Sequence, residues 1–418
     1  MTNETIGEAA FETLAGTPET PAEARNGIRH VVSLSLTKLA DGLINPKLVL
    51  SYLLNALGAP AALVAALVPI REAGALLPQV FLAHRLERMK MRRWMWVVGS
   101  VGQGIAAALI ALAALTLEGA AAGWAFVAGI AALALSRAAA SVSYKDILGK
   151  TVGKRRRGSV TGFAGSVASA GVFVFALLLV SGWLEGTVAL AAAVGVAALL
   201  WVAAAALFST LEEEPSETGQ GGAALRPWKL LREDATFARF VAARGFLTAT
   251  ALAPPYLVIL SGDGEGGLGT LGALVIASAA ASFLSSYAWG RFADHSSRQV
   301  LIVAGVVGAL AMAAAIGASL TGLAATVWAM PAVLFVLMIA HHGVRQGRST
   351  YLVDIATDEN RAAYAATANT LIGGLLLISG AIGGALSFLG PMAALGGFAV
   401  MALIGSGVAL GLKEAEGA

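Results

Sequence analysis

The feature that most constrains this chain is a succession of long apolar stretches that carry almost no charge. A helix of about 20 mostly apolar residues is long enough to cross the hydrocarbon core of a bilayer. Only 13% of the 418 residues are charged and 57% are hydrophobic, whereas a soluble domain carries about 25% charged residues. Such a chain cannot build an ordinary soluble surface. We count twelve candidate spans, at residues 32–57, 60–82, 94–116, 121–143, 160–181, 186–208, 237–260, 267–289, 299–320, 325–346, 364–388 and 392–412.

These spans predict an all-α integral membrane protein with twelve transmembrane helices in two pseudo-symmetric six-helix bundles. The 50 glycines suit this architecture, because small residues let helices approach closely in lipid. Cysteine is absent, which excludes disulfides, thiolate metal sites and thiol redox chemistry. We expect a cytoplasmic tail at 1–31, a first bundle at 32–208, a cytoplasmic linker at 209–236, a second bundle at 237–412 and a cytoplasmic tail at 413–418.

The distribution of lysine and arginine predicts the orientation. Cytoplasmic loops of membrane proteins carry an excess of these residues. With the N-terminus inside, every loop on that side contains Lys or Arg, and the six opposite loops contain none. We therefore expect both termini in the cytoplasm and the protein in the inner membrane. The same loops account for a pI near 9.2 without a nucleic-acid partner.

Two polar segments need separate interpretation. The first 27 residues lack the basic start and the apolar core of a signal peptide. The linker begins with an acidic, glycine-containing stretch that reads as flexible. Its second part, around Trp228, Leu230 and Leu231, is either a short helix at the membrane interface or a plain loop.

The two halves of the chain repeat one another at a spacing of about 209 residues. Arg137 lies nine residues before Asp146, and Arg345 lies nine residues before Asp354. The segment PKLVL in the first span likewise matches PYLVI in the seventh. A parallel repeat of two six-span halves is the architecture of one large transporter class.

The loop between the eighth and ninth spans carries a motif, GRFADHSSR, at residues 290–298. It resembles the G-x-x-x-D-R-x-x-R loop of the major facilitator superfamily, with His295 in place of the usual arginine, and the resemblance covers nearly the whole chain. Gly290 permits a tight turn, and Asp294 can face a helix N-terminus. Arg298 can pair with a carboxylate across the two halves. We expect these residues to latch the cytoplasmic side closed in one state.

Other parts of the family pattern are altered. In the first half, Val80 and His84 stand at the glycine and aspartate positions of the loop motif. The segment ADGL at 40–43 resembles the start of many first spans in the family. Arg137 resembles the basic residue of the fourth-span antiporter motif, although Ser141 replaces the expected glycine. The fifth span lacks the Gly-Pro motif typical of drug/proton antiporters, so these departures weaken a drug-exporter assignment.

A first group of polar residues lies in the first span. Ionisable residues at membrane depth cost about 2.5 kcal/mol or more each and are functional candidates by default. Lys38, Asp41 and Asn45 share one helical face, about 15 Å into the membrane at Asp41. We expect this face to line a water-filled cavity, with Lys38 and Asp41 paired at i, i+3, either as a substrate or proton site or as a static ion bridge. On a continuous helix Lys47 points away, and we treat it as secondary.

A second group is Arg71 and Glu72, which lie between Pro69 and Pro78 in the second span. Adjacent helical residues point about 100° apart, so they should meet different partners, one in span one or four and the other in the cavity. A desolvated carboxylate binds a proton more readily, which suits Glu72 to proton coupling. The alternative is a fixed brace in which Arg71 pairs with Asp41.

A third group, His341 and His342, lies beside Arg345 in the tenth span. Two neighbouring imidazoles can carry protons or bind an anion, although a core histidine is often simply hydrogen-bonded. No metal site is expected, because adjacent histidines without cysteine or a nearby carboxylate make a poor ligand set.

Four residues at repeated positions are candidates for gating. Arg137 and Arg345 occupy equivalent sites in spans four and ten, and Asp146 and Asp354 follow them. We expect the two aspartates to act as gates between the halves. The arginines can either join them or contact the substrate.

These features predict a secondary transporter that works by alternating access around a central site. No Walker-type phosphate loop occurs, so we expect an ion gradient or the substrate gradient to drive it. The first candidate for the driving ion is the proton, bound at Asp41 or Glu72 and, as the next choice, at the histidines. Lys38 and Arg71, with Arg137 and Arg345, suggest a small organic anion or zwitterion as the substrate.

Two other interpretations stay open. One is a proton-driven exporter of hydrophobic or cationic drugs, which Asp41 and Glu72 would recognise. The other is a non-transporting membrane sensor or scaffold on the same fold. The spans contain no recognisable pair of a nucleophile and a base at membrane depth, so we do not expect an enzyme. No cofactor is implied. The expected partners are a small-molecule substrate, protons and membrane lipid, without nucleic acid, and we expect a monomer.

Overall fold

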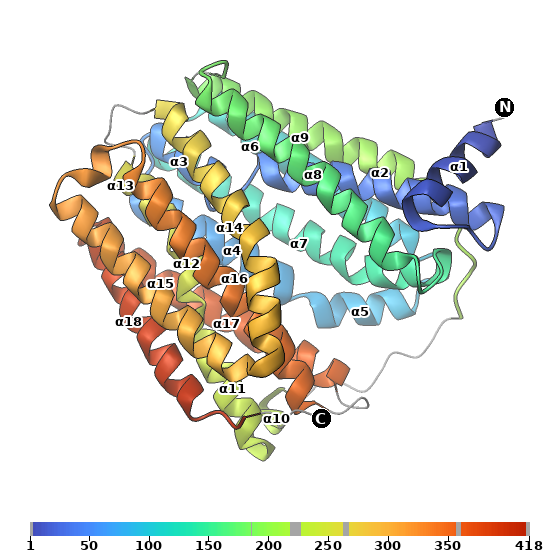
Figure 1. Ribbon diagram of the computed structural model, residues 1–418. Coiled ribbons are helices and arrows are strands. Elements are labelled where there is room, and N and C mark those ends of the chain that lie inside the picture. The colour runs from blue at the N-terminus through green and yellow to red at the C-terminus, as the bar shows by residue number, and fades with distance from the viewer. Residues whose placement is uncertain (1–2, 185, 218–226, 262–266, 357–360, 415–418) are drawn as a thin grey trace.

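The computed structural model describes residues 3–184, 186–217, 227–261, 267–356 and 361–414, and all regular secondary structure in these ranges is helical. Figure 1 shows the helices in two groups. The first group comprises α1 (Asn3–Ala15), α2 (Pro21–Leu43), α3 (Val49–Ala56), α4 (Ala61–Leu76), α5 (Gln79–Glu87), α6 (Arg93–Thr116), α7 (Gly119–Thr151), α8 (Arg157–Val180) and α9 (Gly186–Ser209). The second group comprises α10 (Pro227–Glu233), α11 (Ala235–Leu247), α12 (Ala249–Leu252), α13 (Pro254–Ser261), α14 (Gly267–His295), α15 (Ser297–Leu320), the 3₁₀ turn η1 (Leu323–Ala325), α16 (Ala329–Ile355), α17 (Arg361–Ser387) and α18 (Pro391–Leu410).

Nine helical stretches within the described ranges are long and apolar enough to cross a membrane. They include α4 with α5 as one stretch, Ala61–Glu87, and α11 to α13 as another, Ala235–Ser261. The predicted spans outside this set are the first, eighth and tenth. The first is broken and charged, and α16 of the tenth carries two histidines and two arginines. The chain is a multi-pass membrane protein, and its helices are consistent with the predicted twelve-helix architecture.

The first and seventh spans are both broken near their middle. In the first, α2 ends at Leu43 and α3 begins at Val49, with residues 44–48 non-helical between them. The seventh is divided into α11, α12 and α13. Pro46 explains the break in the first span and Pro254 the one at Ala253, because proline lacks a backbone N–H and clashes with the preceding turn. The expectation of one continuous helix over 32–57 is therefore wrong. The first break overlaps PKLVL at residues 46–50, and the break at Ala253 comes just before PYLVI at residues 255–259.

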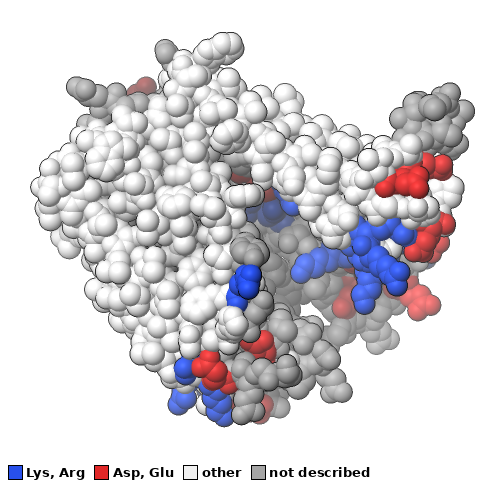
Figure 2. All heavy atoms as spheres, viewed as in Figure 1, with Lys and Arg blue, Asp and Glu red and all other residues white. Residues whose placement is uncertain are grey.

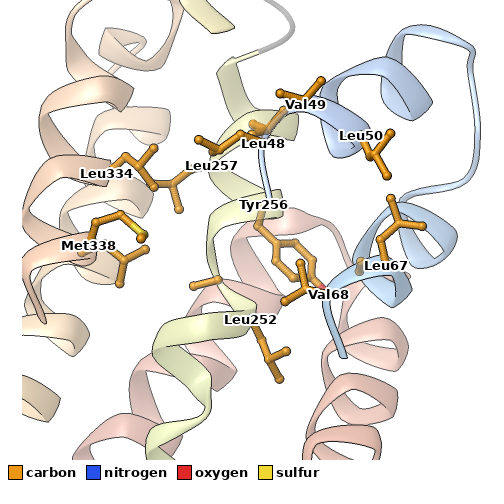
Figure 3. Close-up of a cluster of buried hydrophobic side chains, with 14 of the residues drawn as sticks. Leu48, Val49, Leu50, Leu67, Val68, Leu252, Tyr256, Leu257, Leu334 and Met338 are labelled. Atoms are coloured by element: carbon orange, nitrogen blue, oxygen red, sulfur yellow. The ribbon is translucent and has the colours of Figure 1, made fainter. Parts of the chain in front are cut away.

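The two halves meet on one side of the molecule and separate on the other. We call the side where α1 and α10 lie the terminal side (Figure 1). Away from it, α4 packs against α17, α8 against α14, and α3 against α13. Figure 3 shows the apolar side chains that close this end, with Leu48 and Val68 of the first half beside Leu257 and Tyr256 of the second.

Glycine permits two of these close contacts between the halves. A Cβ built at Gly380 in α17 would lie 2.4 Å from Cγ of Pro69 in α4. One built at Gly272 in α14 would lie 2.6 Å from Cγ2 of Val180 and 2.9 Å from the carbonyl oxygen of Ala176 in α8. Since no real side chain fits these gaps, small residues set the spacing between the halves.

The N-terminal segment expected as a tail at 1–31 consists, in its described part, of α1 and the start of α2, joined by the non-helical residues 16–20. Helix α2 begins early because Thr20 caps it: its hydroxyl accepts the backbone N–H of Glu23 at 3.1 Å, and Pro21 occupies the first helical position. In α1, Phe11 is fully buried against the first bundle. The lack of a side chain at Gly27 leaves room for the Phe11 ring, because a Cβ at Gly27 would lie 2.0 Å from that ring.

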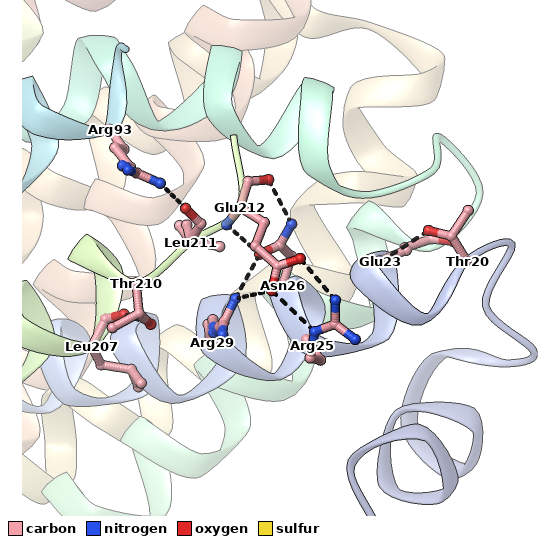
Figure 4. Close-up of polar contacts among 10 residues, drawn as sticks. All are labelled: Thr20, Glu23, Arg25, Asn26, Arg29, Arg93, Leu207, Thr210, Leu211 and Glu212. Atoms are coloured by element: carbon pink, nitrogen blue, oxygen red, sulfur yellow. Dashed lines mark hydrogen bonds and ion pairs between the residues drawn. The ribbon is translucent and has the colours of Figure 1, made fainter. Parts of the chain in front are cut away.

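The segment after α9 is anchored to the first bundle rather than flexible (Figure 4). The Glu212 carboxylate accepts two hydrogen bonds from Arg25, at 3.0 and 2.8 Å, and one from Arg29 at 3.1 Å. Its backbone N–H donates to Asn26 at 2.9 Å. Glu213 is buried and accepts two backbone N–H groups at the start of α6. The beginning of the expected flexible linker is thus held by ion pairs at Glu212 and Glu213. Residues 218–226 of that linker lie outside the described residues, and α10 is a short helix in its second part.

Candidate functional site

A cavity of about 580 Å³ lies between the two halves, a volume in the range of small-molecule sites. Figure 2 shows the hollow between the halves, with charged side chains inside it. Every predicted substrate or proton residue except Lys38 lines this cavity, and so do Arg137 and Arg345. Its polar and charged lining consists of Asp41, Asn45, Lys47, Arg71, Glu72, Gln79, Arg137, Ser141, Ser278, Ser282, His341, His342 and Arg345.

Asp41 is the centre of an ion-pair network within the first half. Arg71 of α4 donates to one carboxylate oxygen at 3.2 Å, and Arg137 of α7 pairs with the other. Lys38 instead donates to the carbonyl oxygen of Thr161 at 3.3 Å. The predicted pair between Lys38 and Asp41 is therefore not formed, because two guanidinium groups already occupy the carboxylate. Asp41 holds α2, α4 and α7 together.

Lys47 is the residue whose position the helical pattern misplaced. Its Nζ atom lies 3.6 Å from Oε1 of Glu72 and 3.2 Å from Nε2 of His341. It therefore connects the break in the first span to α16 in the other half. A helical wheel drawn through the span fails here, because the helix stops before Pro46. Pro46 and Asn45 were the residues in the sequence that indicated this helix break. The Asn45 side chain accepts the Lys47 backbone N–H at 3.0 Å.

His341 joins the two broken spans. An ammonium group only donates, so Nε2 accepts from Lys47, and the ring proton is assigned to Nδ1. The Nδ1 atom lies 3.3 Å from the Thr250 hydroxyl, which in turn donates to the Leu247 carbonyl at 3.0 Å. One neutral imidazole thus links residue 47 to the seventh span. The neighbouring His342 has a buried Nε2 atom with no hydrogen-bond partner among the described residues.

A second cavity, of about 290 Å³, adjoins the first along α16. Three arginines line it. Arg345 is exposed to the cavity, Arg348 is half-buried, and neither makes a hydrogen bond or salt bridge with a described residue. Arg244 is only 6% exposed and donates to Asn369 at 3.0 Å, while its Nε has no partner within the described part. The sequence analysis did not select Arg244, although a single arginine inside an apolar span was a signal that could have identified it.

The charges of the two cavities are unbalanced. Four cations and two carboxylates line the first, a formal net charge of +2 with neutral histidines. The second adds the guanidinium groups of Arg244 and Arg348. This positive excess gives the region an electrostatic preference for anions.

The aspartates expected to gate the halves have partners within their own half. Asp146 pairs with Arg92 and with Lys150, the latter at 3.0 Å. Asp354 accepts a hydrogen bond from the Ser297 hydroxyl at 2.7 Å. Neither contact crosses between the halves, which stand apart on the terminal side.

Arg298 of the latch motif likewise has its partner within its own half. Arg298 pairs with Glu414, at 2.7 Å, after the end of α18. Gly290 and Asp294 belong to α14, and the surroundings of these two residues lie outside what the structure describes. A latch across the halves thus stays a prediction about a state in which the terminal side is closed.

A helical membrane bundle whose two halves enclose a charged cavity, sealed at one end and accessible from the other, defines the class of secondary transporters. The comparisons with known proteins agree. The family model described as Major Facilitator Superfamily matches residues 31–317, and the chain belongs to this family. A search of curated proteins found no match.

Solved structures with the same fold cover nearly the whole chain. A mutant of the nucleoside transporter NupG has a TM-score of 0.72 and 12% identity, covering 92% of this chain and 99% of its own. The POT family transporter PepTSo has a TM-score of 0.71 and 9% identity, covering 92% and 97%. The xylose transporter XylE from E. coli, in an inward open conformation, has a TM-score of 0.63 and 12% identity, covering 94% and 96%. The likeness establishes the fold.

Proposed function

We propose that this protein carries a small organic anion across the inner membrane by alternating access, coupled to protons. The observation that carries the proposal is the excess of cationic groups around a central cavity, with Arg345 facing it unpaired. An anion entering the cavity would offset charges that the protein itself leaves unbalanced.

The fold alone leaves the substrate open. The structures with the same fold are named for a nucleoside, a peptide family and xylose, and a fold can host many activities. We therefore infer the substrate class from the charges in the cavity. A cationic drug needs an unpaired carboxylate, but Asp41 is held by two arginines and Glu72 lies beside Lys47. This arrangement favours an anion over a lipophilic cation.

Glu72 is the better supported of the two candidate proton sites. Protonation of Asp41 would leave Arg71 and Arg137 without their shared partner. Among the described residues, Lys47 is the one cation within salt-bridge distance of Glu72, at 3.6 Å, and the Glu72 side chain is 44% exposed to the cavity. Arg71, Arg345 and Arg348 act on Glu72 from farther away. Glu72 can therefore exchange a proton with cavity water at a smaller cost. Protonation would also free Lys47 to bind the substrate.

The closed end and the hollow end suggest one state of the transport cycle. The apolar contacts around Leu48 and Leu257 close one side (Figure 3), and the cavity opens toward the terminal side. Because basic loops favour the cytoplasm, we assign the terminal side, with both termini, to the cytoplasm. Each chain has its own cavity, so we expect a monomer to be sufficient.

A test uses purified protein in liposomes that contain a pH-sensitive dye. Organic anions that raise the unfolding temperature are selected first, since a ligand at 100 times its Kd adds about 2.7 kcal/mol of stability. Addition of such an anion outside should change the internal pH in step with uptake of the labelled compound. Uptake without a pH change would eliminate proton coupling. Stabilisation by lipophilic cations alone would favour the drug-exporter alternative.

A further inference from the structure

The second cavity contains more positive charge than a general anion site requires. Arg244 of α11 meets Arg345 and Arg348 of α16 there, and none of the three forms a salt bridge with a described carboxylate. Arg348 is close enough to each of the other two for electrostatic repulsion, and to Glu72 for attraction. Glu72 is the one carboxylate among the described residues that line this cavity, against four cations once Lys47 is counted. A positive excess therefore remains at membrane depth unless an anion joins them.

Arg244 gives the cluster the character of a built site. Its side chain is almost fully buried, and Asn369 of α17 fixes one end of the guanidinium at 3.0 Å. Its Nε–H has no partner in the described part of the chain. A buried donor left without an acceptor costs about 1–3 kcal/mol, and more for a charged group. The cost is removed when a ligand supplies the acceptor.

We propose that the substrate is a phosphate monoester whose phosphoryl group binds Arg244, Arg345 and Arg348. This inference rests on the proposed function and specifies its substrate class. Arginine binds phosphate oxygens in pairs of parallel hydrogen bonds. A phosphate monoester offers three terminal oxygens and close to two negative charges near neutral pH. A carboxylate offers two oxygens and one charge, and a sulfate ester three oxygens and one charge.

The adjoining cavity fits the remainder of such a molecule. His341 and Arg345 line both cavities, so the two spaces are neighbours. Besides its charged residues, the larger cavity presents neutral hydrogen-bonding groups on Asn45, Gln79 and Ser278. A polar organic group attached to the phosphate can therefore occupy it.

The first test compares four small anions by thermal unfolding and calorimetry of the full-length protein, at about pH 8, where a monoester is doubly charged. The probes are ethyl phosphate, ethyl sulfate, diethyl phosphate and succinate. We expect ethyl phosphate to bind more tightly than ethyl sulfate by on the order of tenfold. Equal binding of ethyl phosphate and ethyl sulfate, or binding of succinate only, overturns the phosphate assignment but leaves the anion proposal standing. Binding of none of the four overturns the phosphate assignment, and the wider anion screen then decides the proposed function.

The second test uses Arg348→Gln, because Arg348 makes no hydrogen bond that its replacement would break. We expect this variant to lose on the order of tenfold in ethyl phosphate affinity, and Arg348→Lys to lose less. Arg239→Gln is the matched control, since Arg239 is an exposed residue of the same helix as Arg244. Unchanged affinity in Arg348→Gln, or an equal loss in Arg239→Gln, contradicts the assignment.

Discussion

At the scale of single residues, the two carboxylates of the cavity are held in different ways. Asp41 makes ion pairs through both oxygens, to arginines on two different helices. Glu72 has one distant ammonium partner and faces the cavity. From these environments we propose a bracing role for Asp41 and a proton-binding role for Glu72, and the two roles predict different mutant behaviour.

Glu72→Gln should abolish accumulation driven by a proton gradient but preserve exchange of substrate for substrate. Glutamine keeps the size and polarity of the side chain but cannot bind and release the proton. Both activities can be measured in the same liposomes, with and without an imposed pH difference. Normal gradient-driven accumulation in this variant would move proton binding to His341 or Asp41.

Asp41→Asn should instead lower stability, by about 3 kcal/mol, because it leaves Arg71 and Arg137 without a counter-charge at membrane depth. The measurement is the thermal unfolding of purified protein in detergent. Glu118→Gln serves as the control, since Glu118 is exposed at the start of α7 and makes no capping hydrogen bond. An unfolding temperature equal to that of Glu118→Gln would show that Asp41 is not a brace.

Sequence reasoning placed some of these residues and missed others for identifiable reasons. Charges inside apolar stretches are conspicuous, so Asp41 and Glu72 were found directly. Their partners depend on which helices pack together, and the choice of Arg71 over Lys38 for Asp41 follows from that packing. Lys47 was misplaced because its direction is set by the helix break, which a periodic pattern does not contain.

At the scale of elements, hydropathy predicted the spans better than it predicted the helices. The ninth span, expected at 299–320, agrees closely with α15 at Ser297–Leu320. The fourth was expected to end at 143, but α7 continues to Thr151. A hydropathy window responds to the lipid-facing part of a helix, whereas α7 extends into a region where charged residues such as Asp146 and Lys150 pair. Helix ends in such regions depend on contacts between elements.

The anchored segment after α9 should resist moderate acid. Hydrogen bonds from Arg25, followed by those from Arg29, outweigh partial burial and lower the pKa of Glu212 to about 2; an ordinary glutamate has a pKa of about 4.3. The stabilisation is complete above the ordinary pKa and is lost as the pH falls through the lowered one. Cleavage of the segment by pepsin should therefore stay slow at about pH 4 and accelerate toward about pH 2.

A variant separates this effect from general acid unfolding. Glu212→Gln should be cleaved up to about fivefold faster than the natural protein at pH near 4, since the ion pairs are partly exposed and worth about 1 kcal/mol or less. Glu214→Gln is the control, because Glu214 is exposed beside the network and makes no described hydrogen bond. Equal cleavage rates in all three proteins would mean that Glu212 does not anchor the segment.

At the scale of the whole molecule, close packing between the halves stabilises the observed state. Gly272→Ala should shift the protein toward a state open on the opposite side, because the new methyl group would meet Val180 and the backbone of α8. The chain contains no cysteine, so Ser278→Cys supplies a single thiol in the cavity. A membrane-impermeant thiol reagent applied to the opposite side should label it several-fold faster in the Gly272→Ala background. Gly269→Ala is the control, because Gly269 lies on the same helix with open space around it, and this variant should leave the labelling rate unchanged. If Gly272→Ala also left the labelling rate unchanged, the assigned contact would be contradicted.

The net charge of +2 around the first cavity also has an electrical consequence. Moving one elementary charge through 100 mV changes its energy by about 2.3 kcal/mol. When access switches from one side to the other, these fixed charges come to lie in a different part of the transmembrane field. An empty carrier with a positive cavity is drawn toward the negative, inner face, whereas a bound dianion offsets part of this positive charge. Membrane voltage should therefore act more strongly on the return of the empty carrier than on the loaded crossing.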